Sequence, residues 1–293
     1  MNFYDGSTLH EIGNYAFYGS AIEEIKLPLS VSIIGCYAFA YCNKLKKVEF
    51  ANNSILNSIG NFAFLKSVIT SIFIPSKTIR IHKGAFYYCE FLESIEFAED
   101  SELNFIDEYA FANTSIEKIA IPLKVKIINE KTFQKCKKLQ IVSFDENSYL
   151  ESIKKCAFSE TPINTLFIPS KLAELQSGWC KKIDKLTNII ISKKNNNFEW
   201  DNHILIGKSN AFENSFDTLY YARSDNEKIR IPSFIKKISS YAFSNCQQLR
   251  KVDFSLCKEL YIIDKKSFSN TMIKKLQIPS TVTRIEDGSF SKC

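Results

Sequence analysis

The stretch Ala38-Phe39-Ala40-Tyr41-Cys42-Asn43-Lys44-Leu45-Lys46-Lys47-Val48-Glu49-Phe50 recurs, with changes, along most of the 293-residue chain. The phenylalanine of its Ala-Phe step returns alternately 22 and 25 residues later. The phenylalanines that keep this spacing are Phe17, Phe39, Phe64, Phe86, Phe111, Phe133 and Phe158. A period of about 20 to 29 residues is typical of a solenoid, in which one coil cannot bury its own apolar face and adjacent coils stack. The sequence therefore predicts one elongated stack of coils.

The true repeat is a pair of unlike coils that together span 47 residues. The strand of one coil ends in a proline, and the strand of the other ends in a phenylalanine. The prolines are Pro28, Pro75, Pro122 and Pro169, and the phenylalanines are Phe3, Phe50, Phe97 and Phe144. After Phe158 the rhythm slips, and it resumes at Phe243, Phe268 and Phe290.

Each coil contains the pattern of a β-strand and of a compact turn. In Leu45-Lys-Lys-Val48-Glu-Phe50 the last apolar residues alternate with polar ones, as in a half-buried strand. Phe39, Cys42 and Leu45 are three residues apart, which favours a single helical or 3₁₀ turn that packs inward. We therefore expect an α/β, strand-rich fold. It is a right-handed leucine-rich repeat solenoid of about eleven coils, with a parallel sheet on one face and short helical turns on the other. At about 4.8 Å per coil the stack is on the order of 50 Å long.

The slip in the rhythm divides the chain into a repeat block at 1–191, an irregular insertion at 192–228 and a second repeat block at 229–293. The insertion has two strand-like runs, around Trp200 and around Tyr220 and Tyr221, which predict a β-hairpin. Ala211-Phe212 repeats the dipeptide out of register. We expect the insertion to project from one continuous solenoid, where it either joins the two blocks or adds to a binding surface. Both ends of the chain fall within a repeat, so a fragment of a longer array and a naturally short protein are both open.

Composition and motifs favour a folded protein without catalytic chemistry. The net charge is +6, but glutamates interrupt the lysines in the first half, which disfavours a nucleic-acid-binding face. The chain has no run of 18 apolar residues and no visible signal peptide. It also lacks phosphate-binding, nucleophile-elbow and zinc motifs, and its histidines are scattered. The sequence predicts no enzyme activity, no cofactor and no metal.

The nine cysteines do not suggest a disulfide framework. Cys42, Cys89 and Cys136 occupy the same slot on alternate coils, which places them about 10 Å apart, whereas a disulfide needs Cα atoms within about 7 Å. We expect these three to be buried free thiols. One pair is left open among the cysteines outside this slot, which are Cys36, Cys156, Cys180 and Cys257.

The repeat resembles that of the BspA-like leucine-rich repeat proteins. The shared pattern is Ile-Pro-x(2)-Val-x(2)-Ile-Gly-x(2)-Ala-Phe-x(2)-Cys-x(2)-Leu-x(2)-Val-x-Phe, and it covers roughly residues 3 to 191 and 229 to 293. The chain departs from it at Thr132-Phe133, Trp179-Cys180, Ser267-Phe268 and Ser289-Phe290. The resemblance implies a surface antigen that acts in cell adhesion by binding a host matrix protein or a cell-surface protein. It implies no catalytic residues.

The strand positions that point away from the core give the candidate binding surface. Stacking the coils places apolar residues in these positions near the middle of the array and basic residues in the second block. A contiguous apolar patch on a protein surface is a candidate contact surface, and a basic row can steer an acidic partner. The predicted partner-binding residues are Phe73, Ala120, Ile141, Phe167, Ile190, Lys228, Arg230, Lys251 and Lys275.

These observations leave more than one function open. The first is a recognition or adhesion module at the cell surface or in secreted form, and the alternative is a cytoplasmic scaffold or regulatory subunit that uses the same concave sheet. A third, an enzyme with a site assembled across coils, requires a deep pocket with perturbed titratable groups. The Asn52 and Asn113 sequons distinguish the first two, because a glycan there requires the secretory route. The sequence leaves the ligand and the oligomeric state open.

Overall fold

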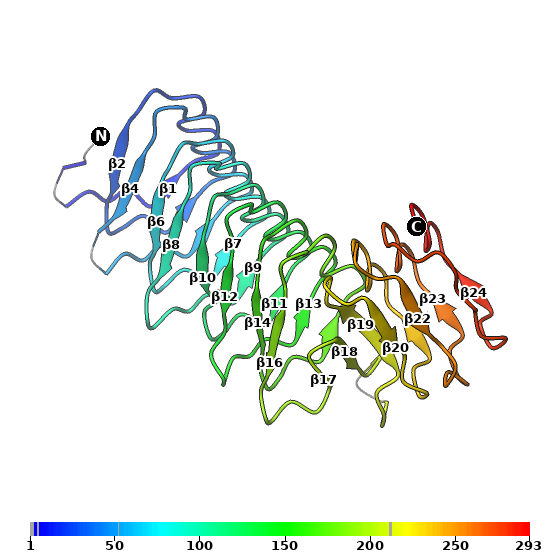
Figure 1. Ribbon diagram of the computed structural model, residues 1–293. Coiled ribbons are helices and arrows are strands. Elements are labelled where there is room, and N and C mark those ends of the chain that lie inside the picture. The colour runs from blue at the N-terminus through cyan, green and yellow to red at the C-terminus, as the bar shows by residue number, and fades with distance from the viewer. Residues whose placement is uncertain (1–2, 5, 52, 211–212) are drawn as a thin grey trace.

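The computed structural model describes residues 3–4, 6–51, 53–210 and 213–293, which form a parallel-sheet β-solenoid of about twelve coils (Figure 1). The two ends of the chain lie at opposite ends of the stack. Each regular coil places a longer strand in one row, a shorter strand in a second row and a compact turn in a third. We call these the long-strand row, the short-strand row and the turn row. The prediction of stacked coils is confirmed.

The long-strand row holds two to four hydrogen-bonded parallel strands in each of its sheets. Its strands are β2 (Glu24–Leu27), β4 (Lys47–Phe50), β6 (Ser71–Ile74), β8 (Ser94–Phe97), β10 (Lys118–Ala120), β12 (Ile141–Ser143), β14 (Thr165–Ile168), β16 (Asn188–Ile191), β20 (Lys228–Arg230) and β22 (Lys251–Asp253).

The short-strand row is a continuous eight-stranded sheet over the first block. The strands of that sheet are β1 (Glu11–Ile12), β3 (Ile33–Ile34), β5 (Ser58–Ile59), β7 (Arg80–Ile81), β9 (Phe105–Ile106), β11 (Ile127–Ile128), β13 (Ser152–Ile153) and β15 (Glu174–Leu175). The same row continues in the second block with β21 (Lys237–Ile238), β23 (Ile262–Ile263) and β24 (Arg284–Ile285).

Alternation along each long strand decides which side chains enter the core. In β6, Ile72 and Ile74 are buried, while Ser71 and Phe73 are exposed. β2 pairs with β4 in register, with Ile25 opposite Val48. Because side chains in a strand alternate between its faces, this register lines up equivalent residues of successive coils in columns.

The strongest column is a stack of phenylalanine rings inside the core. Successive rings from Phe17 to Phe158 are 5.0 to 5.6 Å apart between centroids and lie within 13° of parallel. Phe64 and Phe86 lie on adjoining coils, with centroids 5.2 Å apart. The stack ends where Trp179-Cys180 replaces the dipeptide, and a second stack joins Phe243, Phe268 and Phe290.

The turn row differs from the prediction. No α- or 3₁₀-helix occurs among the described residues, so the expected helical turns, and with them the α/β class, are wrong. The residue before the Ala-Phe step and the residue two positions after it both have positive φ, as at Tyr37 (56°) and Tyr41 (59°). A helix cannot contain such residues, because its φ is negative throughout. None of the described residues belongs to a helix that is long and apolar enough to cross a membrane.

Hydrogen bonds between coils explain why the chain accepts this backbone. Phe39 N–H donates to the Ala63 carbonyl at 2.7 Å, and Tyr41 N–H donates to the Leu65 carbonyl at 2.7 Å. Within the coil, Ala40 N–H donates to the Tyr37 carbonyl at 3.1 Å. Left-handed non-glycine residues cost about 1 to 2 kcal/mol each, and this cost is offset because the turns of adjacent coils bond to one another.

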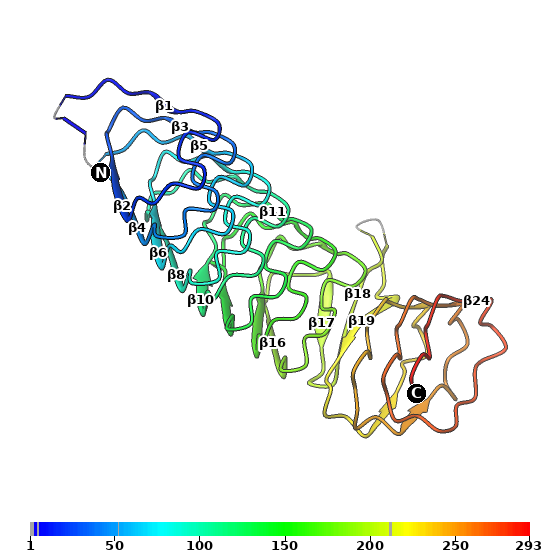
Figure 2. The same cartoon turned by 90° about the horizontal axis from the view of Figure 1, so that it is seen from above.

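The segment between the two blocks lies inside the stack. Its strands are β17 (Phe198–Trp200), β18 (Ile204–Gly207) and β19 (Thr218–Ala222), of which β18 is antiparallel to both others. Leu205 of β18 packs in the core of the first block, and Ile206 packs in the core of the second. Figures 1 and 2 show that the stack changes direction here.

The expectation that this segment projects from the stack is wrong. Tyr220 and Tyr221 are buried, and Tyr221 Oη donates a hydrogen bond to the Leu186 carbonyl at 2.7 Å. Trp200 is half-buried against Tyr221. The reason is that β18 and β19 are apolar on both faces, so each face must be covered by one of the two cores. These aromatic residues therefore offer little surface to a partner, and Ala211-Phe212 lies outside the described residues.

The cysteines belong to the packing of the turn row. All nine are free, and Cys42, Cys89 and Cys136 are buried, as predicted. Cys89 Sγ donates a hydrogen bond to the Phe64 carbonyl of the preceding coil at 2.9 Å, and Cys136 Sγ donates to the Phe111 carbonyl at 3.1 Å. Burial raises the pKa of the Cys89 thiol to about 12 and that of the Cys136 thiol to about 11. Both thiols thus stay neutral donors over the physiological pH range.

Replacing one ring of the phenylalanine column tests its contribution to stability. Phe86→Ala removes a fully buried ring that stacks on Phe64 and Phe111, so we expect a loss of about 3 to 5 kcal/mol in the free energy of unfolding. Urea denaturation measures the change. Phe91→Ala, at an exposed phenylalanine of the same coil, is the control and should change stability by less than about 0.5 kcal/mol. Similar effects of the two substitutions would contradict the column.

The raised thiol pKa values predict both labelling and alkaline stability. At pH 8 the thiol reagent DTNB should react quickly with exposed Cys293 and more slowly with partly exposed Cys36, whereas the seven buried thiols should react only on unfolding. Because the folded pKa of Cys89 lies above the ordinary value of 9.0, stability should fall as pH rises from about 9 towards 12. The Cys89→Ala variant should lose less stability over this range than the unmodified protein. Rapid labelling of more than two thiols in the folded protein would contradict the assignment.

Candidate functional site

Four adjoining strands of the long-strand row expose four apolar side chains, interspersed with the polar side chains of Lys118, Ser143, Thr165 and Asn188. Ile141 is 52% exposed and Ile190 is 49% exposed, in outward positions of β12 and β16. Phe167 of β14 lies directly opposite Ile190 and is half-buried, and Ala120 of β10 is exposed. We call these four residues, Ala120, Ile141, Phe167 and Ile190, the apolar patch. The only charged residue in the outward positions of these four strands is Lys118, in a part of the chain that the structure describes throughout.

Phe73 does not belong to the apolar patch, although the sequence placed it there. It lies on β6, and its neighbour on β8 in the same outward column is Glu96. Glu96 is exposed and stands between Phe73 and Ala120 of β10. The structure therefore separates the predicted apolar row into Phe73 and the patch over β10 to β16.

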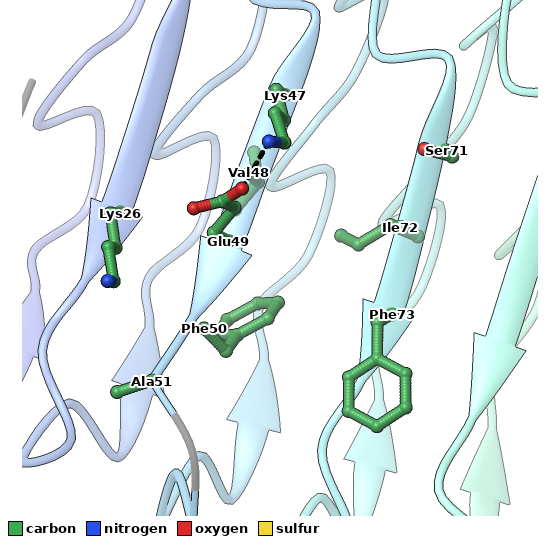
Figure 3. Close-up of a pocket in the computed structure, with 9 residues that line it drawn as sticks. All are labelled: Lys26, Lys47, Val48, Glu49, Phe50, Ala51, Ser71, Ile72 and Phe73. Atoms are coloured by element: carbon green, nitrogen blue, oxygen red, sulfur yellow. Dashed lines mark ion pairs between the residues drawn. The ribbon is translucent and has the colours of Figure 1, made fainter.

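Phe73 instead borders a shallow cleft between β4 and β6 with a volume of about 500 Å³ (Figure 3). The ring of Phe50 extends from the end of β4 toward β6, and Ile72 reaches from β6 toward β4. At the rim Lys47 and Glu49 form an ion pair, with Lys26 on the far side of β4. Phe50 is half-buried, and its repeat every 47 residues marked it in the sequence as a distinct strand-ending position.

The basic residues of the second block are separated from the apolar patch. Lys228 pairs with Lys251 across β20 and β22, while β17, β18 and β19 follow β16 in the chain and the stack. Arg230 Nε donates to Asp253 Oδ2 at 3.0 Å, so part of the positive charge is compensated. Hydrogen bonds from Ser255, and then the ion pair with Arg230, lower the pKa of Asp253 to about 2. Lys275 is exposed beyond β22 and belongs to no strand. We call Lys228, Arg230, Lys251 and Lys275 the basic row. The apolar patch and the basic row are therefore two separate surfaces.

The turn row carries an aromatic ridge that the sequence analysis did not single out. Tyr15 stacks on Tyr37 with ring centroids 5.0 Å apart, and Tyr37 stacks on Phe62 at 5.2 Å. Lys66 Nζ lies 5.5 Å from the Tyr41 ring centroid and 5.8 Å from that of Tyr88. Because the rings cover one another's faces, the ridge chiefly stabilises the packing of adjacent turns. Its signal in the sequence is the aromatic residue directly before several of the Ala-Phe steps.

Among the residues that the structure describes, the histidines contact a backbone carbonyl, a carboxylate and an amide. His10 contacts the Ser30 carbonyl, His82 lies 3.6 Å from Asp107, and His203 contacts Asn226. Desolvation lowers the pKa of His82, while Arg80 holds Asp107 in a two-bond ion pair. None of these partners is a serine, threonine or cysteine side chain that a histidine base could activate. Among the described residues no group of three or more His, Cys, Asp or Glu side chains is placed to hold a metal ion.

Solved structures of bacterial proteins resemble this fold. The pneumococcal vaccine antigen PcpA is 22% identical, with a TM-score of 0.67 over 82% of this chain and 65% of that one. A leucine rich cell surface protein from Faecalibacterium prausnitzii is 20% identical, with a TM-score of 0.69 over 97% of this chain and 74% of that one. A leucine-rich repeat protein from Bacteroides ovatus is 23% identical, with a TM-score of 0.57 over 97% and 80% of the two chains. At these identities the likeness shows the fold alone. This chain spans less than two thirds of the length of the pneumococcal antigen.

The repeats of this chain match a family model. No curated protein matches the chain. The BspA type leucine rich repeat region matches in six copies, over residues 10–140, 104–215 and 206–293. These matches cover nearly the whole chain, including the strands of the long-strand row that carry the apolar patch. The chain belongs to the BspA-type leucine-rich repeat family.

Proposed function

We propose that the chain is a non-enzymatic recognition module that binds a protein partner on the exposed face of the long-strand row. The observation that carries the proposal is the apolar patch, where β10, β12, β14 and β16 expose Ala120, Ile141, Phe167 and Ile190 around a single lysine. Exposed apolar groups on adjoining strands cost free energy in water and are typical of contact surfaces. The low charge at the centre of the patch matches the composition of interface cores.

The family and the structural neighbours support adhesion as the setting for this binding. Two of the neighbours are described as a vaccine antigen and as a cell surface protein, which are statements about those proteins. By this likeness the partner is a host matrix protein or a cell-surface protein, and the chain acts at the cell surface or in secreted form. The basic row of Lys228, Arg230, Lys251 and Lys275 is then a second contact surface for an acidic region of the same partner.

A second candidate function is a cytoplasmic scaffold that holds another protein on the same face. The observation that favours it is the state of the cysteines, because all nine are free and seven are buried. Free thiols persist in reducing compartments, whereas secreted proteins usually pair them. A glycan on Asn113 in native material would favour the surface role, and an unmodified, fully reduced cytosolic pool would favour the scaffold. Asn52, the other sequon, lies outside the described residues.

The absence of enzyme activity is part of the proposal and has its own support. Burial raises the pKa of the Cys89 thiol to about 12, which keeps it from acting as a thiolate nucleophile at neutral pH. The histidine contacts described above include no serine or cysteine side chain that a base would activate. The family model that matches the chain describes a leucine rich repeat region.

A double substitution in the patch tests the proposal. Ile141→Asp with Ile190→Asp places two charges on the patch at side chains that are about half exposed, so folding should be unchanged while binding is lost. We expect immobilised unmodified protein to capture a partner from matrix and cell-surface extracts, and recovery by the variant to fall about 100-fold. Quantitative mass spectrometry of the captured proteins measures this.

The matched control places the same charges on another face. Ile33→Asp with Phe105→Asp changes side chains that are 40% and 48% exposed in the short-strand row, and it should leave recovery unchanged. Circular dichroism checks that both variants are folded. Equal capture of the same partners by the patch variant and the unmodified protein would sink the proposal.

A further inference from the structure

Phe91 is an exposed aromatic residue in a position that is polar in the other coils of its type. It follows Cys89 by two residues, and the same position after the equivalent cysteines holds Lys44, Lys138 and Gln248. Phe91 is 57% exposed, the largest exposed fraction among the phenylalanines that the structure describes. Its ring stacks on no other ring of the described residues, unlike the rings of the aromatic ridge. The packing of the repeat therefore does not account for an aromatic side chain here.

The ring of Phe91 lines a pocket of about 320 Å³ between the turns of two adjacent coils. Small-molecule sites have volumes of about 300 to 1,000 Å³, so the pocket is large enough for a small ligand. It lies on the turn row, whereas the apolar patch lies on the long-strand row. One coil contributes Lys66, Ser67 and Val68 to the lining, and the next contributes Tyr88, Glu90 and Phe91.

Bonds between coils hold the backbone on both sides of the pocket. Lys66 N–H donates to the Tyr87 carbonyl of the next coil at 3.0 Å. Ser115 Oγ donates to the Glu90 carbonyl at 2.7 Å, also across a coil boundary. The Tyr88 ring packs edge-on against Tyr87, with ring centroids 4.6 Å apart. A site that is held in this way loses little conformational entropy when a ligand binds.

Two opposite charges line the pocket without pairing. The Lys66 ammonium lies 5.5 Å from the Tyr41 ring centroid and 5.8 Å from that of Tyr88, where the ring faces attract it. Lys66 and Glu90 are both exposed, and neither forms an ion pair with any residue in the part of the chain that the structure describes. A ligand in the pocket therefore meets an unmatched hydrogen-bond donor and an unmatched acceptor.

This chemistry selects a neutral ligand that carries a donor, an acceptor and an apolar group close together. Glu90 would repel an anion, and Lys66 would repel a cation. The acetamido group of an N-acetylated amino sugar combines an N–H, a carbonyl oxygen and a methyl group. The sugar ring beside it presents a face of C–H groups, whose slight positive charge matches the negative face of an aromatic ring.

We propose that the pocket binds an N-acetylated amino sugar of a neutral glycan. The acetamido N–H donates to the Glu90 carboxylate, and its carbonyl oxygen accepts a hydrogen bond from Lys66 Nζ. The C–H face of the sugar packs on the open ring of Phe91. This inference goes beyond the proposed function, because the site lies on another row of the solenoid and takes a carbohydrate.

Exposed tyrosines continue the site along the turn row. Tyr41 and Tyr18 are both exposed, and their ring centroids are 5.4 Å apart. Lys66 lies between Tyr41 and Tyr88, so these rings lead from the pocket toward the first coil. Further sugar units of the same glycan pack on Tyr41 and Tyr18.

Two tetrasaccharides test the ligand by isothermal titration calorimetry with the full chain. Chitotetraose is a chain of N-acetylglucosamine units, and cellotetraose has the same linkage without the acetamido groups. We expect saturable binding of chitotetraose and about tenfold weaker binding of cellotetraose, which leaves Lys66 and Glu90 without their amide partner. Equal binding of the two tetrasaccharides, or no binding of chitotetraose, would overturn the assignment.

Three single substitutions test the position of the site. Phe91→Lys introduces the residue type of Lys44 and Lys138, so the fold should be retained while chitotetraose affinity falls about tenfold. Lys66→Met keeps the apolar stem without the ammonium and should weaken binding similarly. Phe73→Lys changes an exposed phenylalanine of the long-strand row and should leave affinity within about twofold. Circular dichroism checks folding, and full chitotetraose affinity in Phe91→Lys would overturn the site.

Enzymatic removal of glycans from the matrix and cell-surface extracts identifies the source of the sugar. If chitotetraose binds and glycan removal abolishes partner capture, the site is supported and the sugar belongs to the partner protein. If chitotetraose binds and capture is unchanged, the site is supported and the sugar belongs to a free polysaccharide. If Phe91→Lys loses capture of proteins without glycans, the pocket binds a polypeptide and the proposal is overturned.

The outcome is separable from that of the proposed function. If chitotetraose does not bind while Ile141→Asp with Ile190→Asp still abolishes partner capture, the sugar site is wrong and the recognition module stands. If the patch variant captures its partners normally but chitotetraose binds with the predicted dependence on Phe91, the sugar site stands and the patch is not the contact surface.

Discussion

Every coil of this protein depends on the coil before it and the coil after it. The ring of Phe39 is covered on one face by Phe17 and on the other by Phe64, and its N–H donates to the next coil rather than to its own. The left-handed residues of the turn row are tolerated because these bonds hold them. No coil can satisfy its own backbone or bury its own ring, so the stack is the unit that folds, as in other repeat proteins. The outward surfaces are then fixed by the register of that stack.

The junction shows what happens when this dependence is interrupted. Trp179-Cys180 breaks the phenylalanine column, and β18 inserts as an antiparallel strand with Leu205 in one core and Ile206 in the other. The strand shields the open end of each block from water, and the stack changes direction around it. The apolar patch and the basic row are therefore two separate surfaces of the stack.

Much of the fold could be predicted from the sequence, because the repeat spacing extends along most of the chain and can be read without knowledge of any contact. The 47-residue repeat predicted the stacked columns and the buried cysteines, and alternation predicted the exposure of Ile141 and Ile190. The turns were mispredicted as helical, because tyrosine, lysine and asparagine adopt positive φ there for the sake of bonds between coils, which leave no local signature. Glu96 and β18 divide the predicted site. Their places beside it are set by strand pairing, which the sequence alone did not show.

The most direct test of the stack removes one complete repeat. Deleting residues 76–122 takes out 47 residues and joins Pro75 to Leu123 in register, whereas deleting 76–108 takes out 33 and does not. Small-angle X-ray scattering measures the longest dimension of each product. The account predicts that the 47-residue deletion yields a folded solenoid about 10 Å shorter, while the 33-residue deletion loses its ordered structure. An unfolded product from the 47-residue deletion, or a folded one of unchanged length, would contradict the stacking of equivalent coils.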